Sequence, residues 1–108
     1  MTENRKNKHR NFNDLVVDQF KNDPSLADKF LKDSIKEYEK DGDEKVLLIA
    51  LKQVALSKGG FQELSKKTGL SRESLYKTLS INGNPRFATL KKILGALNYG
   101  IYFKHIEA

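Results

Sequence analysis

Glycine, proline and asparagine divide this chain of 108 residues into short segments, and most segments repeat their apolar residues at helical spacing. The clearest segment runs from Pro24 to about Lys40. Asp23-Pro24 is a start signal, because Asp can cap free backbone N–H groups and Pro tolerates the first helical position. An amphipathic helix is expected, with five apolar residues on one side: Leu26, Phe30, Leu31, Ile35 and Tyr38.

Two further long helices follow the same logic. From about Glu44 to Lys58 nearly every position between Val46 and Leu51 is apolar, which predicts burial on more than one side. Gly59-Gly60 ends this helix. A last helix, closed near Asn98 and Gly100, is indicated by apolar residues at helical spacing: Phe87, Leu90, Ile93, Leu94 and Leu97. The fold class is therefore all-α.

Neither end of the chain shows a clear helical pattern. Residues 1–11 are polar and basic after Met1 and are expected to form a disordered tail. Residues 12–20 fit either a short strand or a helical turn, and the pattern does not decide between them. Residues 99–106 are rich in aromatic and β-branched side chains, which predicts a short C-terminal β-strand. Because a single strand is unstable in water, it needs a partner, such as its copy in a dimer.

The central segment, residues 61–80, reads FQELSKKTGLSRESLYKTLS and predicts two short helices joined by a tight turn. Gly69 supplies the left-handed conformation that closes the first helix, Leu70 buries the turn, and Ser71 caps the second. Such a junction also occurs in ordinary helical domains. Here the free face of the second helix is polar and basic, which favours a helix-turn-helix that reads DNA.

A helix of this kind presents its N-terminal residues to base edges in the major groove. Arg72 can donate two hydrogen bonds to guanine, Glu73 can accept one from the cytosine amino group, and Lys77 can donate one. Tyr76 can donate a hydrogen bond or pack on a thymine methyl group. Phosphate contacts are expected from residues that flank this helix, namely Gln62, Asn84 and Arg86.

The charge distribution separates the two parts of the chain. From Lys45 onward there are 11 Lys and Arg against 3 acidic residues, a net charge of +8. Residues 11–44 carry 5 Lys against 10 acidic residues, a net charge of −5. This asymmetry predicts a basic part that faces double-stranded DNA and an acidic part that faces another partner. We therefore divide the chain into a tail (1–11), an acidic extension (12–43), a DNA-binding domain (44–98) and a terminal strand (99–108).

Other classes of function have little support. The chain has no cysteine, and His9 and His105 lie at opposite ends, so no metal or cofactor is expected. No serine lies in a glycine-framed nucleophile turn, and residues 41–44 fail the EF-hand spacing, so we do not expect an enzyme. No apolar run has the length of a membrane span, and the N-terminus lacks the apolar centre of a secretory signal, which predicts a cytoplasmic protein.

Residues 44–98 resemble the Cro/phage-repressor (Xre) helix-turn-helix superfamily. More narrowly, the stretch TGLSRESLYKTLSINGNPRFATLKKILGAL, residues 68–97, is similar to the HigA-like addiction module antidote proteins. The likeness extends over residues 12–106. One departure lies at Phe61-Gln62-Glu63, where members more often have Met-Thr-Gln.

The resemblance implies a homodimeric antitoxin that binds an operator in its own promoter and neutralises a RelE/ParE-like toxin. By motif it assigns base reading to Ser71, Arg72, Glu73, Tyr76 and Lys77. Two alternatives remain open. One is a stand-alone prophage-type transcription regulator without a toxin. The other is a protein-interaction module that has lost DNA binding.

Overall fold

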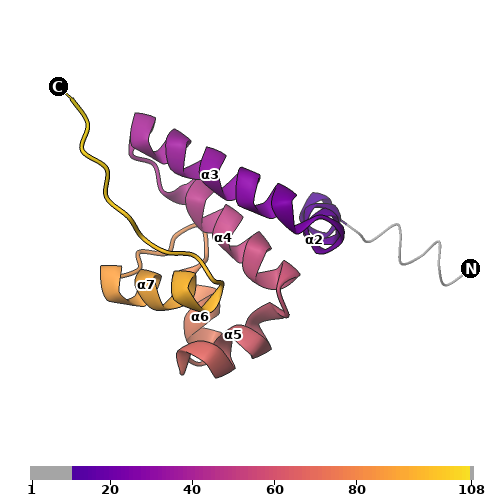
Figure 1. Cartoon of the computed structure of the whole chain (residues 1–108). Helices are drawn as coiled ribbons and strands as arrows, with labels where there is room; N and C mark the ends of the chain where they lie inside the picture. The colour runs from indigo at the N-terminus through magenta and orange to yellow at the C-terminus, as the bar shows by residue number, and fades with distance from the viewer. Residues whose placement is uncertain (1–10, 108) are drawn as a thin grey trace, which may run out of the picture.

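The computed structural model describes residues 11–107, which form six α-helices and, within that range, no β-strand (Figure 1). The helices are α2 (Phe12–Asn22), α3 (Pro24–Asp41), α4 (Lys45–Ser57), α5 (Gly60–Thr68), α6 (Arg72–Thr78) and α7 (Phe87–Ala96). The all-α prediction is confirmed for the described residues. The predicted disordered tail lies, apart from Asn11, outside them.

Residues 12–20, whose type the sequence left open, belong to helix α2. Asn11 begins it with a capping box: its side chain accepts a hydrogen bond from the Asp14 backbone N–H, and the Asp14 carboxylate accepts one from the Asn11 N–H. Both bonds satisfy donors that a helix N-terminus leaves free. The short polar pair Asn11 and Asp14 was therefore the signal that distinguishes helix from strand here. Val16, Val17 and Phe20 are the buried side chains of α2.

Helix α3 has nearly the predicted bounds, but it buries a different set of side chains. Pro24 occupies the first turn as expected, whereas Asp23 makes no capping hydrogen bond to the helix and accepts one from the Ser25 hydroxyl instead. The buried residues are Ala27, Leu31 and Ser34. Of the five apolar residues expected on one side, four are exposed by 37 to 41%, namely Leu26, Phe30, Ile35 and Tyr38.

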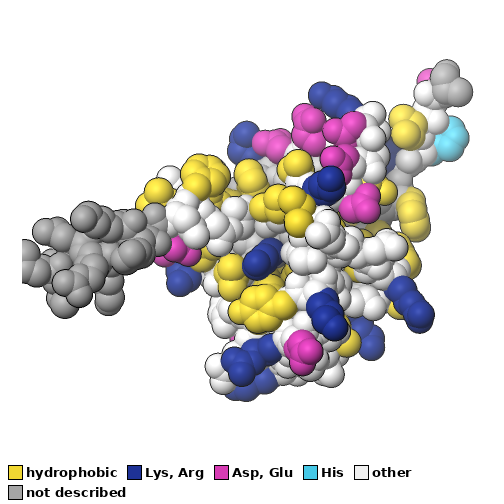
Figure 2. Space-filling model, turned by 180° about the vertical axis from the view of Figure 1, so that it is seen from behind, with side chains coloured by type: hydrophobic (Ala, Val, Ile, Leu, Met, Phe, Trp, Pro, Cys, Tyr) yellow, Lys and Arg dark blue, Asp and Glu magenta, His cyan; other side chains and the backbone are white. Residues whose placement is uncertain are grey.

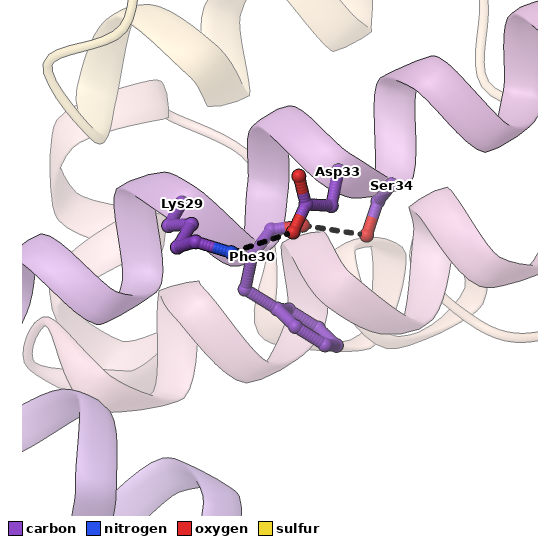
Figure 3. A network of polar contacts seen from close by, with 4 residues as sticks. All are labelled: Lys29, Phe30, Asp33 and Ser34. Carbon is purple, nitrogen blue, oxygen red and sulfur yellow. Dashed lines mark hydrogen bonds and ion pairs between the residues drawn. The ribbon is translucent and has the colours of Figure 1, made fainter.

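These four apolar residues stay exposed because α3 packs on α4 along one narrow line. Ala27, Leu31 and Ser34 form that line, at spacings of four and three residues, and the larger side chains beside it stay partly exposed. The Ser34 hydroxyl donates to the Phe30 carbonyl oxygen, so its burial leaves no donor unpaired (Figure 3). On the outer side, Lys29 pairs with Asp33 at 3.4 Å (Figure 3).

Helix α4 is the centre of the core, as its nearly continuous apolar pattern predicted. It packs against α2, α3 and α5. Leu48, Leu51 and Val54 are at most 2% exposed. The rest of the core comes from two parts of the chain. Helices α2 and α3 supply Val16, Phe20, Ala27 and Leu31, and the later part supplies Phe61, Leu64, Leu75, Leu79, Ile93 and Leu97.

A polar junction joins the acidic helix α3 to the end of α7. The Tyr99 hydroxyl donates to the Asp28 carboxylate, and the Lys58 ammonium lies 4.7 Å from the centre of the Tyr99 ring. Lys58 also donates to the Leu97 carbonyl oxygen at 3.2 Å. Burial, the hydrogen bond and the negative charge of Asp28 raise the pKa of Tyr99 well above its ordinary value. Tyr99 therefore stays a neutral hydrogen-bond donor at physiological pH.

The predicted C-terminal strand is wrong for this single chain. Residues 100–107 have no regular secondary structure and project from the end of α7 (Figure 1). Tyr102, Phe103 and Ile106 are 89%, 92% and 83% exposed. A strand needs a neighbouring strand for its hydrogen bonds, and residues 11–99 contain none.

Candidate nucleic-acid interface

Three hydroxyl groups hold the turn between α5 and α6. Gly69 adopts φ 77°, ψ 4°, and its N–H donates to the Ser65 carbonyl oxygen, which closes α5 as predicted. The Ser65 hydroxyl donates to the Leu70 carbonyl oxygen. The Thr68 hydroxyl donates to the Leu64 carbonyl oxygen and accepts from the Leu70 N–H. These roles of Ser65 and Thr68 were not predicted from the sequence, although both hydroxyl residues lie in the last turn before Gly69.

The third hydroxyl belongs to Ser71, the N-cap of α6. Its side chain accepts from the Ser74 N–H at 3.0 Å, which confirms the predicted cap. Leu75 and Leu79 are 0% and 1% exposed and hold one side of α6 against the core. Leu70, within the turn, packs against that core and is partly buried. The direction of α6 is thus set both by local hydrogen bonds and by burial.

The opposite side of α6 is free. Arg72, Glu73 and Lys77 are all exposed. Within residues 11–107, none of these three side chains makes a hydrogen bond or ion pair with another side chain. Their donors and acceptors are therefore available to an external ligand without first breaking an internal contact. This is the arrangement that reading of base edges requires.

Tyr76 differs from its three neighbours on α6. It is 51% exposed, but its ring packs on Phe61 of α5, with ring centres 4.4 Å apart and planes tilted by 57°. The Lys52 ammonium of α4 lies 5.8 Å from the same ring. Aromatic pairs of this geometry contribute about 0.5–1.5 kcal/mol beyond their buried area. Tyr76 therefore fixes α6 against α5, and only part of its ring is available for contact.

The predicted flanking residues come from two other places. Gln62 is exposed in the first turn of α5, and Asn84 and Arg86 are exposed in the loop before α7. That loop turns back tightly after α6, because the Gly83 N–H donates to the Ser80 carbonyl oxygen at 2.8 Å. Helix α7 packs on α5, which places the loop beside the α5–α6 unit.

Charge is divided between the two ends of the molecule. On the face seen in Figure 2, acidic side chains gather over the end formed by α3, while Lys and Arg predominate towards the opposite end. Figure 2 agrees with the −5 and +8 counts for residues 11–44 and 45–108. The basic end therefore attracts polyanions, and the acidic end repels them.

Residues 11–107 contain neither a cluster suited to a metal ion nor a membrane-spanning helix. No group of three His, Asp or Glu side chains is placed to hold a metal ion in that range. None of the helices in the same range is long and apolar enough to cross a membrane.

The fold and the exposed helix define a small helical protein with a polar, basic face and a separate acidic face. The chain belongs to the family of probable addiction module antidote proteins, whose model matches residues 16–105. It is also 43% identical over 53 residues to an uncharacterized protein of Haemophilus influenzae. That match covers 49% of this chain and 54% of the relative, so the chain spans about half the length of the relative it matches. No solved structure shows significant similarity to the chain.

Proposed function

We propose that this protein is a DNA-binding antitoxin and the autorepressor of a type II toxin–antitoxin module, of the HigA-like, Xre type. Helix α6 is its recognition helix, within a DNA-binding domain of residues 44–98. The observation that carries the proposal is the set Arg72, Glu73 and Lys77. These side chains are exposed, and among residues 11–107 they have no side-chain partner, on a helix fixed by Ser71 and Leu75. Membership of the antidote family supports a regulatory role rather than an enzymatic one.

In this proposal base reading uses α6 and its cap, and phosphate contacts flank it. Arg72, Glu73 and Lys77 read base edges, together with Ser71 and the exposed part of Tyr76. Gln62, Asn84 and Arg86 contact phosphates, which position the protein but carry no sequence information. The protein acts in the cytoplasm as a homodimer, because one short helix reads few base pairs and two half-sites multiply the specificity.

The toxin is proposed to be RelE/ParE-like and to bind the acidic extension. Proteins that act on RNA are commonly basic, and the outer side of α3 carries exposed Asp33 and Glu37. Among residues 11–107 their ion-pair partners are Lys29 and Lys40 on the same helix, in exposed pairs that contribute little to stability. Asp28 is different, because it accepts the Tyr99 hydrogen bond and is part of the fold.

Replacement of Arg72 or Lys77 by Ala tests the DNA-binding part. Each variant is expected to weaken operator binding by roughly 1–3 kcal/mol, about 5- to 150-fold, because a base contact is lost. The measurement is a titration of labelled promoter DNA at fixed salt, with helicity checked by circular dichroism. The matched control is Lys36→Ala on α3, which also removes one exposed positive charge and should leave DNA affinity unchanged. Unchanged affinity in both α6 variants would contradict the assignment of α6.

Reversal of Asp33 and Glu37 to Lys tests the toxin-binding part. Toxin binding is expected to fall at least tenfold, while operator affinity is kept or rises, because positive charge is added far from α6. The toxin for this assay is the product of the neighbouring gene. Lys32→Ala with Lys36→Ala serves as the control, because it alters the same helix without adding positive charge. If the reversed variant still binds toxin normally, another surface holds the toxin.

The stand-alone regulator remains the second candidate. It predicts that no neighbouring gene encodes a small toxic protein that this chain neutralises. Co-expression of the adjacent gene with and without this chain, scored by cell growth, distinguishes the two.

A further inference from the structure

The C-terminal tail, residues 100–107, carries apolar side chains that a single chain leaves in water. Tyr102, Phe103 and Ile106 are each more than 80% exposed. In an extended backbone, Tyr102 and Ile106 point to one side and Phe103 to the other. Docking of the tail on its own chain would therefore cover one side and leave the second exposed. Both sides are covered only when the tail lies between two protein surfaces.

A groove suited to one side of the tail lies between the end of α3, the start of α4 and the loop before α7. It has a volume of about 230 Å³, and Tyr38, Leu47, Pro85 and Leu90 are among its lining residues. A cavity of about 150 Å³ accommodates benzene, so this groove can take one aromatic ring. Phe87, one turn before Leu90 on α7, is another apolar side chain left in water, at 61% exposure.

The charges of the tail and of the groove are complementary. Lys104 and His105 follow Phe103 directly. Glu44 lines the groove, and the chain segment beside it is acidic, with Glu39, Asp41 and Asp43 exposed around Lys40. Glu44 makes no side-chain capping bond to α4, so its carboxylate is not committed to the helix.

We propose that in the homodimer the tail of each chain lies in this groove of the second copy, with the Phe103 ring in the groove and the basic tail beside the acidic segment that ends at Glu44. Each chain supplies one tail and one groove. Two-fold symmetry makes the two tail–groove contacts equivalent, so the assembly closes as a dimer. Tyr102, on the opposite side of the tail, points away from the groove. This inference specifies the dimer of the proposed function and rests on it.

The first test compares two aromatic residues of the tail. Phe103→Ala should raise the dimer dissociation constant roughly tenfold or more, because a buried aromatic anchor is lost. Tyr102→Ala, the matched control on the opposite side of the tail, should change it by less than about threefold, because that ring does not enter the groove. The measurement is sedimentation equilibrium over a concentration series without DNA or toxin, with helicity checked for each variant.

The second test changes the groove and the charges. Tyr38→Glu, at an exposed position of the groove wall, should weaken the dimer as Phe103→Ala does, and the two changes together should cost less than their sum. Lys104→Glu and Glu44→Lys should each weaken the dimer modestly, and the double variant should recover the loss.

Three outcomes would overturn the inference. A dimer lost in Phe103→Ala but intact in Tyr38→Glu would assign the tail to another surface, such as the tail of the second copy. A dimer unaffected by Phe103→Ala with toxin binding lost would assign the tail to the toxin. A strict monomer whose tail is protected would place the tail in its own groove. In each case Arg72→Ala still tests DNA reading independently, so failure of this inference is distinguishable from failure of the proposed function.

Discussion

Replacement of Gly83 by Ala should destabilise the protein, because the loop after α6 approaches that helix too closely for a side chain. A Cβ atom on Gly83 would lie 2.1 Å from the Thr78 carbonyl oxygen and 2.9 Å from the Thr78 carbonyl carbon. Both are backbone atoms at the end of α6, so they cannot rotate away, and the loop itself must move. Overpacking of this kind costs about 1–3 kcal/mol, and contact with rigid backbone favours the upper half of that range.

Two other glycines provide controls: replacement by Ala should destabilise the protein at one and stabilise it at the other. Gly69 has open space for a Cβ atom but a φ of +77°, so Gly69→Ala should cost about 1–2 kcal/mol from backbone strain alone. Gly95 lies within α7 with open space and no positive φ, so Gly95→Ala should stabilise the protein by about 0.5–1 kcal/mol. The order of stability is therefore Gly95→Ala, wild type, Gly69→Ala and Gly83→Ala.

Urea denaturation followed by circular dichroism measures this order through the transition midpoint, provided that the slope m is unchanged. A loss of about 2 kcal/mol also lowers Tm by roughly 8–16 °C for a domain of this size. Since the moved loop carries Asn84 and Arg86, Gly83→Ala should also weaken DNA binding. A Gly83→Ala variant as stable as the wild type would refute the close approach of the loop to Thr78.

Two further predictions concern the polar contacts at Ser71 and Tyr99. Ser71→Ala removes the cap of α6 and should lower the free energy of unfolding by about 1 kcal/mol, measured in the same urea assay, whereas Ser71→Asn should retain most of the stability. Tyr99 has a pKa raised in the folded state, so it stabilises the fold below its unfolded value of about 10 and loses this contribution as the pH rises further. The wild type should therefore lose its stability advantage over Tyr99→Phe as the pH rises above about 10, and an advantage that stays constant there would contradict the contact with Asp28.

Much of the fold follows from local sequence signals. Pro24, the glycine pair 59–60, Gly69 and Ser71 mark helix ends through backbone conformation and capping, which depend on residues only a few positions apart. For the same reason the exposed side of α6 was predictable from the spacing of Leu75 and Leu79. The base-reading assignment of Arg72, Glu73 and Lys77 stays a prediction.

Only the tertiary structure decided which side chains are buried and whether the tail forms a strand, because both depend on residues distant in the sequence. Spacing placed Phe30 and Ile35 on the apolar side of α3, but only the line of contact with α4 determines that Ala27 and Ser34 are buried in their place. The helical spacing predicted that Tyr76 faces outward. In the structure Phe61 of α5 covers part of its ring. The tail has a strand-like sequence but no strand beside it in the described chain, because hydrogen bonding in a sheet needs a second segment that its own sequence cannot supply.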